Sequence, residues 1–444
     1  MADTLPPDRH RSAGKQRGDT SGNVADPRYA RSFQPDATGE RPSQGRGAPR
    51  CRTGDIGHDR HRPGRRDGDA RSRRGGPAER APRANPAAPG PAGAPARGAL
   101  RGEAYAALDL GTNNCRLLIA RPSGRDFTVI DAFSRVVKLG EGLATTGRLS
   151  DAAMDRALSA LAICADKLRR RNVRLARSVA TEACRRAVNG AEFIERVRRE
   201  TGIALDVISA EEEARLAVLG CHILLEAGEG PAMIFDIGGG STELVLLEAG
   251  DAAGRRVPRI LDWQSVPWGV VSLTDTVGHD EGIEGEAGRA GRLERYARMR
   301  ELVADSFAGF AARIGDAPRA DDIRLLGTSG TVTTLASLHL ELPQYDRKAV
   351  DGLIVCSDDM RAISARLSGM SPAERCNLPC IGNDRADLVV AGCAILETIL
   401  DLWPAARLGV ADRGIREGIL RSMMAADRQG ERALRKLRGE RPER

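Results

Sequence analysis

Two stretches of the chain share one pattern of apolar and polar positions: an apolar run, an aspartate, a glycine-containing polar loop and a second apolar run. They cover 106–120 and 233–247. Aligned without a gap, they place Asp109 on Asp236 and Arg116 on Glu243. Each stretch predicts a β-hairpin. Because the pattern occurs twice, we expect two related half-domains whose loops face each other across a cleft.

Strand-like and helix-like segments alternate between and after these hairpins. Apolar residues at helical spacing predict a helix over 150–172, followed by a strand over 173–180 and a helix that Thr181 caps. A strand over 203–209 then leads into a helix through 226. The second part predicts a helix over 292–314, a strand over 323–326, a long helix over 383–403 and a closing strand, loop and helix over 408–420. This alternation is typical of an α/β protein.

The first 102 residues differ in composition from the rest. Residues 1–100 hold 13 of the 23 prolines and few large apolar side chains, so we expect 1–102 to be a disordered tail. They carry 20 Arg and Lys against 11 Asp and Glu, whereas the rest of the chain carries 48 against 50. The basic character of the protein therefore belongs to the tail. Its arginines could contact nucleic acid, polyphosphate or anionic lipid, but a solvated tail is the reading we favour.

The apolar segments, cysteines and histidines bear on whether the protein is a membrane protein, a secreted protein or a zinc protein. No apolar segment approaches the ~20 residues needed to span a bilayer, and the N-terminus lacks the apolar region of a signal peptide. The nine cysteines are scattered, as in a reduced cytoplasmic protein, and Cys376 and Cys380 lack the partners of a zinc site. The histidines His222, His279 and His339 are isolated in the sequence, so we expect no Ser-His-Asp catalytic set.

The hairpin loops have the composition of phosphate-binding loops. Three consecutive glycines, Gly238, Gly239 and Gly240, would permit unusual backbone conformations and let amide groups approach an anion. A third loop of this kind joins the predicted strand 323–326 to a helix. From these loops we expect phosphate contacts by Gly111, Thr112, Asn113, Asn114, Gly238, Gly239, Gly240, Ser241, Thr242, Gly327, Thr328, Ser329 and Gly330.

Six sequence blocks, spread from about 103 to 425, resemble the exopolyphosphatase and guanosine-pentaphosphate phosphohydrolase (Ppx/GppA) family in its short two-domain form. They are DLGTNNCRLLIA, SVATEACRRAVN, VISAEEEARLAVLG, FDIGGGSTELVL, LLGTSGTVTTLA and ADRGIREGIL. The resemblance implies two actin-like domains of the sugar kinase, Hsp70 and actin superfamily, with a ribonuclease H-like α/β core. We expect domain I over 103–215, completed by a C-terminal helix over 410–426, domain II over 216–409, and a basic, disordered tail over 427–444.

The resemblance also implies roles for individual residues. Glu213 matches the proposed catalytic base and Glu243 a second catalytic carboxylate, while Glu212 has the spacing to cap its helix with Ser209. The residues carried over for binding are Arg185 for phosphate, Arg385 for substrate selection, and Asp109 and Asp236 for Mg²⁺.

The function implied is a cytoplasmic, Mg²⁺-dependent phosphoanhydride hydrolase. Its expected reaction is exopolyphosphatase activity, the release of terminal phosphate from inorganic polyphosphate by attack of water. The alternative is hydrolysis of guanosine pentaphosphate (pppGpp) to the tetraphosphate, a reaction of the stringent response. A small-molecule kinase and a non-catalytic nucleotide-dependent scaffold are rivals from other classes. We expect no specific nucleic-acid partner, no membrane association and, by resemblance, a homodimer.

Overall fold

The computed structural model describes residues 102–437, apart from 125, 229, 249–256 and 316–322. The tail predicted over 1–102 lies outside the described residues except for Gly102, and so does the end of the chain from 438. No helix in the described part is both long and apolar enough to cross a membrane.

The first half of the described chain is built on a five-stranded sheet, sheet A, with strand order β3-β2-β1-β4-β5. Strands β3, β2 and β1 are antiparallel, whereas β1, β4 and β5 are parallel. The strands and helices of this half are β1 (Ala104–Leu110), β2 (Asn114–Ser123), β3 (Asp126–Val136), α1 (Leu143–Thr146), α2 (Asp151–Arg170), β4 (Val173–Ala180), α3 (Glu182–Arg186), α4 (Gly190–Thr201) and β5 (Asp206–Val207).

The second half is built on a six-stranded sheet, sheet B, with strand order β10-β11-β9-β6-β7-β8. Helix α5 (Ala210–Cys221) and the short 3₁₀ helix η2 (His222–Leu224) lead into it. Its elements are β6 (Ala232–Ile237), β7 (Thr242–Leu247), β8 (Ile260–Val266), α6 (Val270–Val277), α7 (Gly285–Ile314), β9 (Arg324–Thr328), α8 (Gly330–His339), α9 (Arg347–Val350), β10 (Ile354–Cys356), α10 (Ser357–Gly369), α11 (Pro372–Cys376), η4 (Asn383–Arg385), α12 (Leu388–Leu402), β11 (Arg407–Ala411) and α13 (Ile415–Leu437).

The two sheets correspond strand for strand. The order β3-β2-β1-β4-β5 in sheet A matches β8-β7-β6-β9-β11 in sheet B, with β10 added at the edge. Both predicted hairpins are confirmed as β1-β2 and β6-β7, and Asp109 pairs with Arg116 as Asp236 pairs with Glu243. The gapless alignment of the two sequence stretches is therefore also an alignment of their hydrogen-bond registers.

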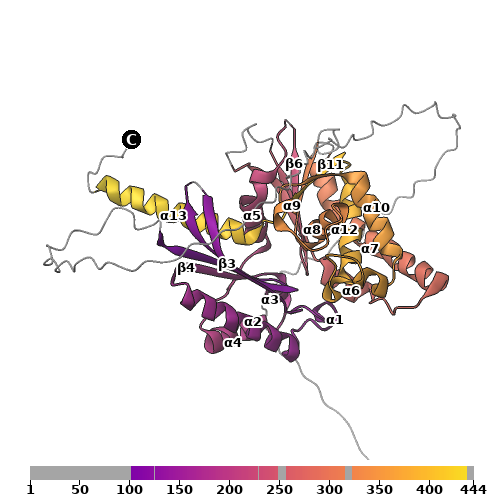
Figure 1. Ribbon diagram of the computed structural model, residues 1–444, viewed down its shortest axis with the longest axis horizontal. Helices are drawn as coiled ribbons and strands as arrows, with labels where there is room; N and C mark the ends of the chain where they lie inside the picture. The colour runs from indigo at the N-terminus through magenta and orange to yellow at the C-terminus, as the bar shows by residue number, and fades with distance from the viewer. Residues whose placement is uncertain (1–101, 125, 229, 249–256, 316–322, 438–444) are drawn as a thin grey trace, which may run out of the picture. The chain divides into compact units, whose positions relative to one another are not determined.

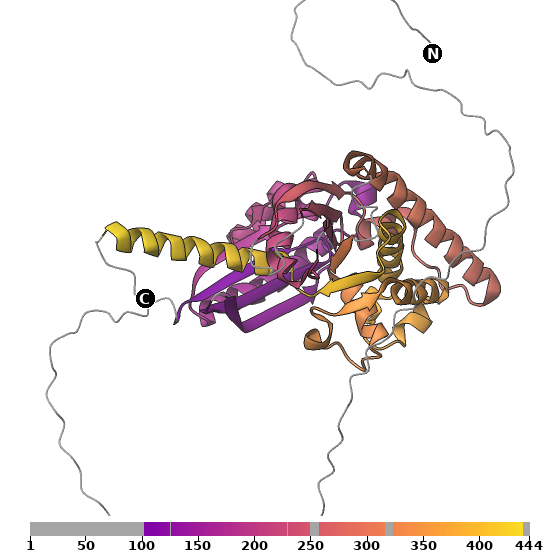
Figure 2. The ribbon, with the colours of Figure 1, turned by 90° about the horizontal axis from the view of Figure 1, so that it is seen from above.

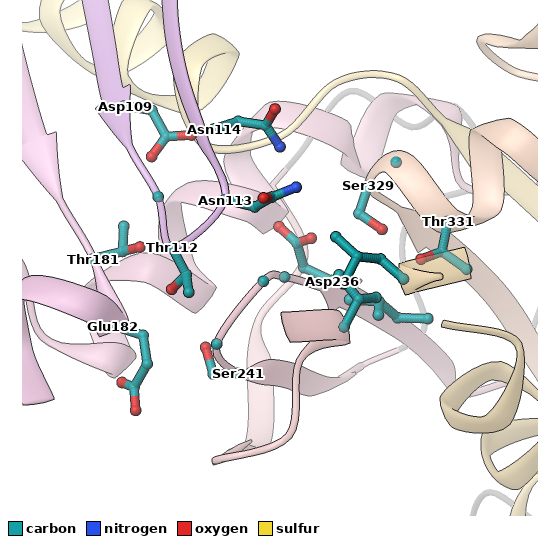
Figure 3. A pocket seen from close by; sticks show the side chains of 18 of the residues that line it. Asp109, Thr112, Asn113, Asn114, Thr181, Glu182, Asp236, Ser241, Ser329 and Thr331 are labelled. Atoms are coloured by element: carbon teal, nitrogen blue, oxygen red, sulfur yellow. The ribbon is translucent and has the colours of Figure 1, made fainter. Parts of the chain in front are cut away.

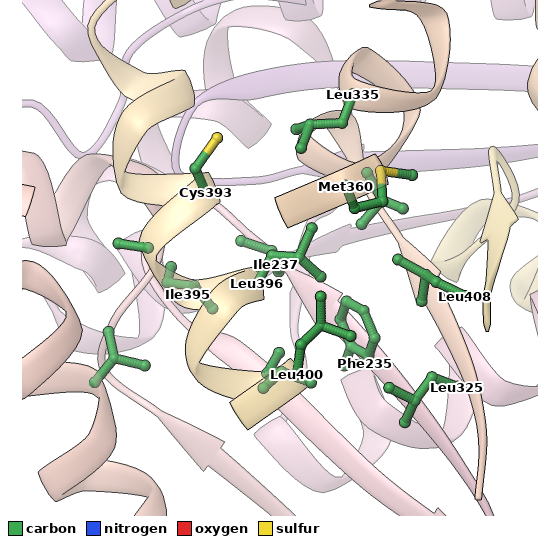
Figure 4. Close-up of a cluster of buried hydrophobic side chains, with 14 of the residues drawn as sticks. Phe235, Ile237, Leu325, Leu335, Met360, Cys393, Ile395, Leu396, Leu400 and Leu408 are labelled. Atoms are coloured by element: carbon green, nitrogen blue, oxygen red, sulfur yellow. The ribbon is translucent and has the colours of Figure 1, made fainter. Parts of the chain in front are cut away.

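Each sheet is covered by its own helices. Apolar faces of α2 and α4 pack on one side of sheet A, with Leu161 and Phe193 fully buried (Figure 1). In the second half, α12 is apolar on nearly all sides and packs with α7, α8 and α10 over sheet B. Figure 4 shows Leu396 and Leu400 of α12 facing Phe235 of β6 in that core. The halves thus have separate hydrophobic cores.

Helices α5 and α13 connect the two halves. Leu216 of α5 joins Ile419 and Leu420 of α13 in a cluster under sheet A, whereas Val218 on the opposite face of α5 packs against sheet B. The two helices cross closely, because a Cβ at Gly220 would lie 1.9 Å from the carbonyl oxygen of Gly414. Figure 2 shows α13 in yellow, running along the strands of sheet A and continuing past them. Helix α5 therefore carries its first turn, including Glu213, to the place where the sheets meet.

Several predicted element boundaries were wrong. The strand expected over 203–209 is only Asp206–Val207, and the helix that follows ends at Cys221 rather than 226. The long helix expected from 383 begins at Leu388, after the 3₁₀ turn η4. Apolar content alone could not distinguish a strand from an extended connection, because only pairing with a neighbouring strand makes the difference.

The C-terminal prediction was also wrong over 427–437. The helix expected to end at 426 continues to Leu437, and its expected start at 410 falls inside strand β11. Asp427 accepts a hydrogen bond from the Tyr105 hydroxyl and pairs with Arg174, so sheet A stabilises this part of the helix. Of the tail predicted over 427–444, the part 438–444 lies outside the described residues. The boundary expected at 215/216 falls within α5, which is one continuous helix.

Candidate active site

A single pocket collects residues from both hairpin loops and from the β9-α8 loop. Figure 3 shows Asn113 of the first loop, Asp236 near the end of β6 and Ser329 before α8 reaching toward the same space. Of the residues predicted for the site, those that line the pocket are Asp109, Gly111, Thr112, Asn113, Asn114, Glu213, Asp236, Gly238, Gly239, Gly240, Ser241, Glu243, Ser329, Gly330 and Arg385. The cleft expected between the repeated halves therefore holds most of the candidate chemistry.

The triple glycine allows the two hairpin loops to approach each other closely. The expectation of unusual backbone conformations was wrong, because none of the three glycines has a positive φ. A Cβ at Gly239 would instead lie 3.0 Å from Cβ of Thr112, and a Cβ at Gly240 would lie 2.6 Å from Oγ1 of Thr112. Side chains at these positions would push the second loop away from the first. The glycines therefore bring the two loops into contact.

Five buried polar atoms in the pocket have no hydrogen-bond partner among the described residues. They are Asp109 Oδ1, Thr112 Oγ1, Asn113 Oδ1, Asn114 Oδ1 and Ser329 Oγ. Most buried polar atoms in folded proteins are paired, so a cluster of unpaired atoms in one pocket indicates a site for a polar ligand. Ser329 also has φ of 107°, a conformation that is strained for a residue with a side chain. The hydroxyl at the start of α8 is thus held in the pocket at an energetic cost.

The pocket is rich in carboxylates with raised pKa values. Burial, and secondarily the neighbouring Asp236, raises the pKa of Glu243 to about 7. Burial raises the pKa of Asp236 to about 6 against the opposing effect of Arg116. Burial also raises the pKa of Asp109, which Arg116 and Arg416 counteract. Concentrated negative charge of this kind is typical of a site that works with cations or moves protons.

Glu213 lies in the first turn of α5, where only 6% of the residue is exposed. Its Oε2 accepts hydrogen bonds from Arg185 at 3.1 and 3.2 Å. Burial and the neighbouring Glu243 raise the pKa of Glu213 well above its usual value, although Arg185 opposes them. The Ser209 hydroxyl accepts from the amide of Glu212, which is one half of the predicted capping box, whereas the Glu212 carboxylate pairs with Arg177 at 2.8 Å. The Glu213 side chain lines the pocket.

Glu243 is held in place by two hydroxyl groups. Its Oε1 accepts from Ser241 at 2.6 Å and from Ser265 at 3.0 Å. Ser241, predicted to contact phosphate, therefore donates its hydroxyl hydrogen to Glu243 in this structure. A carboxylate fixed in this way keeps one orientation toward the pocket.

Four predicted phosphate ligands do not line the pocket. Thr242 donates its hydroxyl hydrogen to the carbonyl of Trp268, and Thr328 donates to that of Arg413. Gly327 makes room for the Phe235 ring, since a Cβ there would lie 2.7 Å from it. Arg185 does not line the pocket but contacts two carboxylates that do, Glu213 at 3.1 Å and Glu182 at 2.7 Å. In this structure its guanidinium positions carboxylates.

Sequence reasoning missed two charged residues that line the pocket, Arg116 and Glu182. Arg116 lies directly opposite Asp109 in the β1-β2 pair, and residues so paired share one face of a sheet. The alignment of Arg116 on Glu243 was therefore a usable signal. Glu182 offered no such signal, because only the folded chain brings it beside Gly240.

The two aspartates fit a hydrated divalent cation better than a fully protein-ligated one. The described residues contain no group of three or more His, Cys, Asp and Glu side chains arranged to hold a metal ion. Mg²⁺ usually keeps several waters and binds through one or two carboxylates together with substrate phosphates. Asp109, with an unpaired buried Oδ1, and Asp236 offer two such carboxylates in one pocket.

Comparison with known proteins agrees with this geometry. The model of the Ppx/GppA phosphatase family matches residues 118–427. Exopolyphosphatase 2 of Mycobacterium tuberculosis is 30% identical over 335 residues, covering 72% of this chain and 98% of its own. An exopolyphosphatase structure from Cytophaga hutchinsonii is 25% identical, with a TM-score of 0.63 over 73% of this chain and 98% of its own. A family member from Aquifex aeolicus is 27% identical, with a TM-score of 0.57 over the same 73% and 98%. The expected fold class is confirmed.

Proposed function

Because the chain belongs to the Ppx/GppA phosphatase family, we propose that it releases terminal phosphate from inorganic polyphosphate by attack of water. The observation that carries this proposal is the cluster of five unpaired buried polar atoms beside the carboxylates Glu213, Asp236 and Glu243. The hydroxyls of Thr112 and Ser329 can donate to phosphate oxygens, while the acceptor oxygens of Asp109, Asn113 and Asn114 suit a hydrated cation. The pocket thus offers contacts for a cation-bound phosphate together with a carboxylate that accepts a proton. Both are needed to hydrolyse a phosphoanhydride.

The charge balance of the pocket supports a divalent cation as part of the reaction. The lining carboxylates are Asp109, Glu182, Glu213, Asp236 and Glu243, against the guanidinium groups of Arg116 and Arg385. A polyphosphate chain entering alone would meet net repulsion. Mg²⁺ held by Asp109 and Asp236 would neutralise phosphate oxygens and polarise the transferred group. We therefore expect chelation of Mg²⁺ to abolish phosphate release.

Glu213 is the residue we assign as general base. Its raised pKa makes this carboxylate a stronger base than an ordinary glutamate, which suits a group that accepts a proton from water. Arg185, bonded to the same Oε2, keeps the carboxylate in one orientation. Glu243, with a pKa of about 7, is a second carboxylate that could orient the water. Arg116 and Arg385 would bind oxygens of the phosphates farther along the chain.

One observation favours pppGpp as the alternative substrate. Apolar side chains, among them Val270, Leu388 and Val389, line the same pocket as the carboxylates. An inorganic polyphosphate has no apolar part, whereas a nucleoside could pack against such a surface. Hydrolysis of pppGpp is therefore the second candidate reaction. A cytoplasmic location, a role in the stringent response and a homodimeric state remain predictions from the family resemblance.

The test is a direct comparison of substrates with a matched pair of variants. Purified protein with Mg²⁺ is given short polyphosphate, pppGpp, or ATP with a panel of sugars, and released phosphate and phosphorylated sugar are measured. Glu213→Gln should lower kcat by roughly 10²- to 10⁴-fold on the true substrate. Glu211→Gln, in the same helical turn but exposed, should change it less than about twofold. Equal rates for the two variants would contradict the assignment of Glu213 as general base. Phosphorylation of a sugar would contradict the proposal that the protein is a hydrolase.

A further inference from the structure

The two phosphate loops are linked by a second route besides their direct contact. In the second half, the first turn of α6 supports the triple-glycine loop: the amides of Val270 and Val271 donate to the carbonyls of Gly238 and Gly239 at 3.0 and 2.8 Å. In the first half, the segment 137–140 supports the other loop. There the amides of Val137 and Gly140 donate to Asn113 and Thr112 at 2.8 and 2.9 Å.

Asp275 joins these two supports. It lies near the C-terminal end of α6, and its Oδ2 accepts a hydrogen bond of 2.9 Å from the amide of Gly142, just before α1. Helices α1 and α6 lie side by side (Figure 1). A continuous chain of hydrogen bonds therefore runs from one loop through α6, Asp275 and the segment 137–142 to the other loop.

His279 holds Asp275, which lies four residues before it in the chain. Its ring contacts Oδ1 of Asp275 at 3.3 Å and Oδ2 of Asp387 at 2.5 Å. Asp387 lies two residues after Arg385, and Lys138 pairs with Asp384 at 3.4 Å on the other side of that arginine. The connection between the halves thus also reaches the segment that carries Arg385.

We propose that Asp275, held by His279, is a positioning residue that sets the spacing between the two phosphate loops and Arg385. The expected effect on KM rests on the proposed function, whereas the connection between the loops does not. Asp275 does not line the pocket, so it acts through Gly142 and α6 and does not contact substrate. Glu213 lies on α5, outside this connection, so the proton-accepting step should be affected less than the binding of phosphates.

The connection should weaken as the pH rises. Both ring nitrogens of protonated His279 donate hydrogen bonds, whereas the neutral ring donates only one, so one aspartate then loses its donor. Asp275 and Asp387 raise the pKa of His279, although burial opposes them. The other charged groups packed around this site are Asp280, which pairs with Arg295 and Arg375, and Arg375 itself, which also approaches Asp387. The contribution of His279 is therefore complete at low pH and lost as the pH passes its raised pKa.

The structural test needs no substrate. Hydrogen exchange of the peptide 137–147 is measured by mass spectrometry on the full chain, with rates expressed as protection relative to the intrinsic rate. Asp275→Ala should lower protection of the Gly142 amide about tenfold, and His279→Ala should lower it less. Wild-type protection should fall as the pH rises through the His279 titration, and that fall should be absent in His279→Ala. The control Glu301→Ala, an exposed residue of α7 paired with Arg298, should behave as wild type.

The kinetic test separates positioning from a merely structural role. Asp275→Ala should raise KM for short polyphosphate about tenfold and lower kcat by less than about threefold. Lost protection with an unchanged KM would overturn the positioning role and leave the proposed function standing. Unchanged protection in Asp275→Ala would overturn the connection itself, whatever the protein hydrolyses.

Discussion

The two hairpins have the same backbone but carry opposite charges at one position. In β1-β2, Asp109 faces Arg116, whereas in β6-β7, Asp236 faces Glu243. The first hairpin therefore combines a carboxylate with a guanidinium that can bind phosphate, and the second brings two carboxylates together. The two loops also differ in side chains. The first loop carries Thr112 and two asparagines, whereas the second has three consecutive glycines, two of which pack closely against Thr112. One repeated element thus supplies two complementary parts of a site.

Among tests of the difference between the hairpins, the largest effect is expected from replacing the aspartate of one hairpin or of the other. Asp236→Ala should lower kcat/KM by about 10²- to 10³-fold, because Glu243 beside it cannot replace a lost cation ligand in the same geometry. Asp109→Ala should cost about tenfold, since Arg116 remains to bind phosphate. Titration with Mg²⁺ tests whether weaker Mg²⁺ binding causes the loss, because excess Mg²⁺ should then partly restore the activity of Asp236→Ala. A deficit that does not respond across the millimolar range, with the fold intact by circular dichroism, would place Asp236 in a structural or water-positioning role.

Adding a methyl group to each loop tests the packing difference. Gly239→Ala should destabilise the protein by about 1–3 kcal/mol, because its Cβ would lie 3.0 Å from Thr112 Cβ and 3.1 Å from the Asn113 amide. Gly111→Ala should change stability much less, since the nearest atom would be the Asn114 carbonyl oxygen at 3.5 Å. Urea unfolding at fixed pH measures both. Equal effects of the two variants would show that the loops separate without cost.

The pH dependence of stability should differ between Asp236 and Asp131, a carboxylate paired with Lys167 and Arg171. The pKa of Asp236 is raised to about 6, so its contribution to stability is present below its unfolded pKa and is lost as the pH rises through 6. Asp236→Asn should therefore stabilise the metal-free protein by about 1–3 kcal/mol at pH 8 and not at pH 4. Asp131 is the control of opposite sign, because a hydrogen bond from Lys167 lowers its pKa. Asp131→Asn should destabilise at pH 8, and thermal unfolding with chelator present compares the two.

The smallest effect on activity and stability is expected from deleting the N-terminal segment, which lies outside both hairpins. Deleting residues 1–100 should leave phosphate release within about twofold and stability within about 0.5 kcal/mol, because the composition of this segment offers no hydrophobic core. Assays of the truncated and full-length chains, together with their melting temperatures, measure this. A truncated protein that melts well below the full-length one would show that the segment packs on the rest of the chain.

The positions most open to sequence reasoning were those whose role depends on near neighbours in the chain. Hairpin register, the cap at Ser209 and the pairing of Asp109 with Arg116 all follow from spacing within a few residues. By contrast, Thr328 and Gly327 had the composition of a phosphate loop, yet their surroundings use them for a hydrogen bond to Arg413 and for packing against Phe235. The tertiary environment chose between two roles that the same residue types can fill.

The sequence by itself determined the repeat, the alternation of strands and helices and most of the residues that line the pocket, because hydrophobic period and loop composition are local properties. Only the tertiary structure decided that the triple glycine serves contact with Thr112, that Arg185 positions Glu213, and that His279 joins Asp275 to Asp387. Each of these depends on residues at least 28 positions apart, except the contact of His279 with Asp275. Distances across the fold are set by how the separate cores pack together, and a linear pattern does not encode them residue by residue.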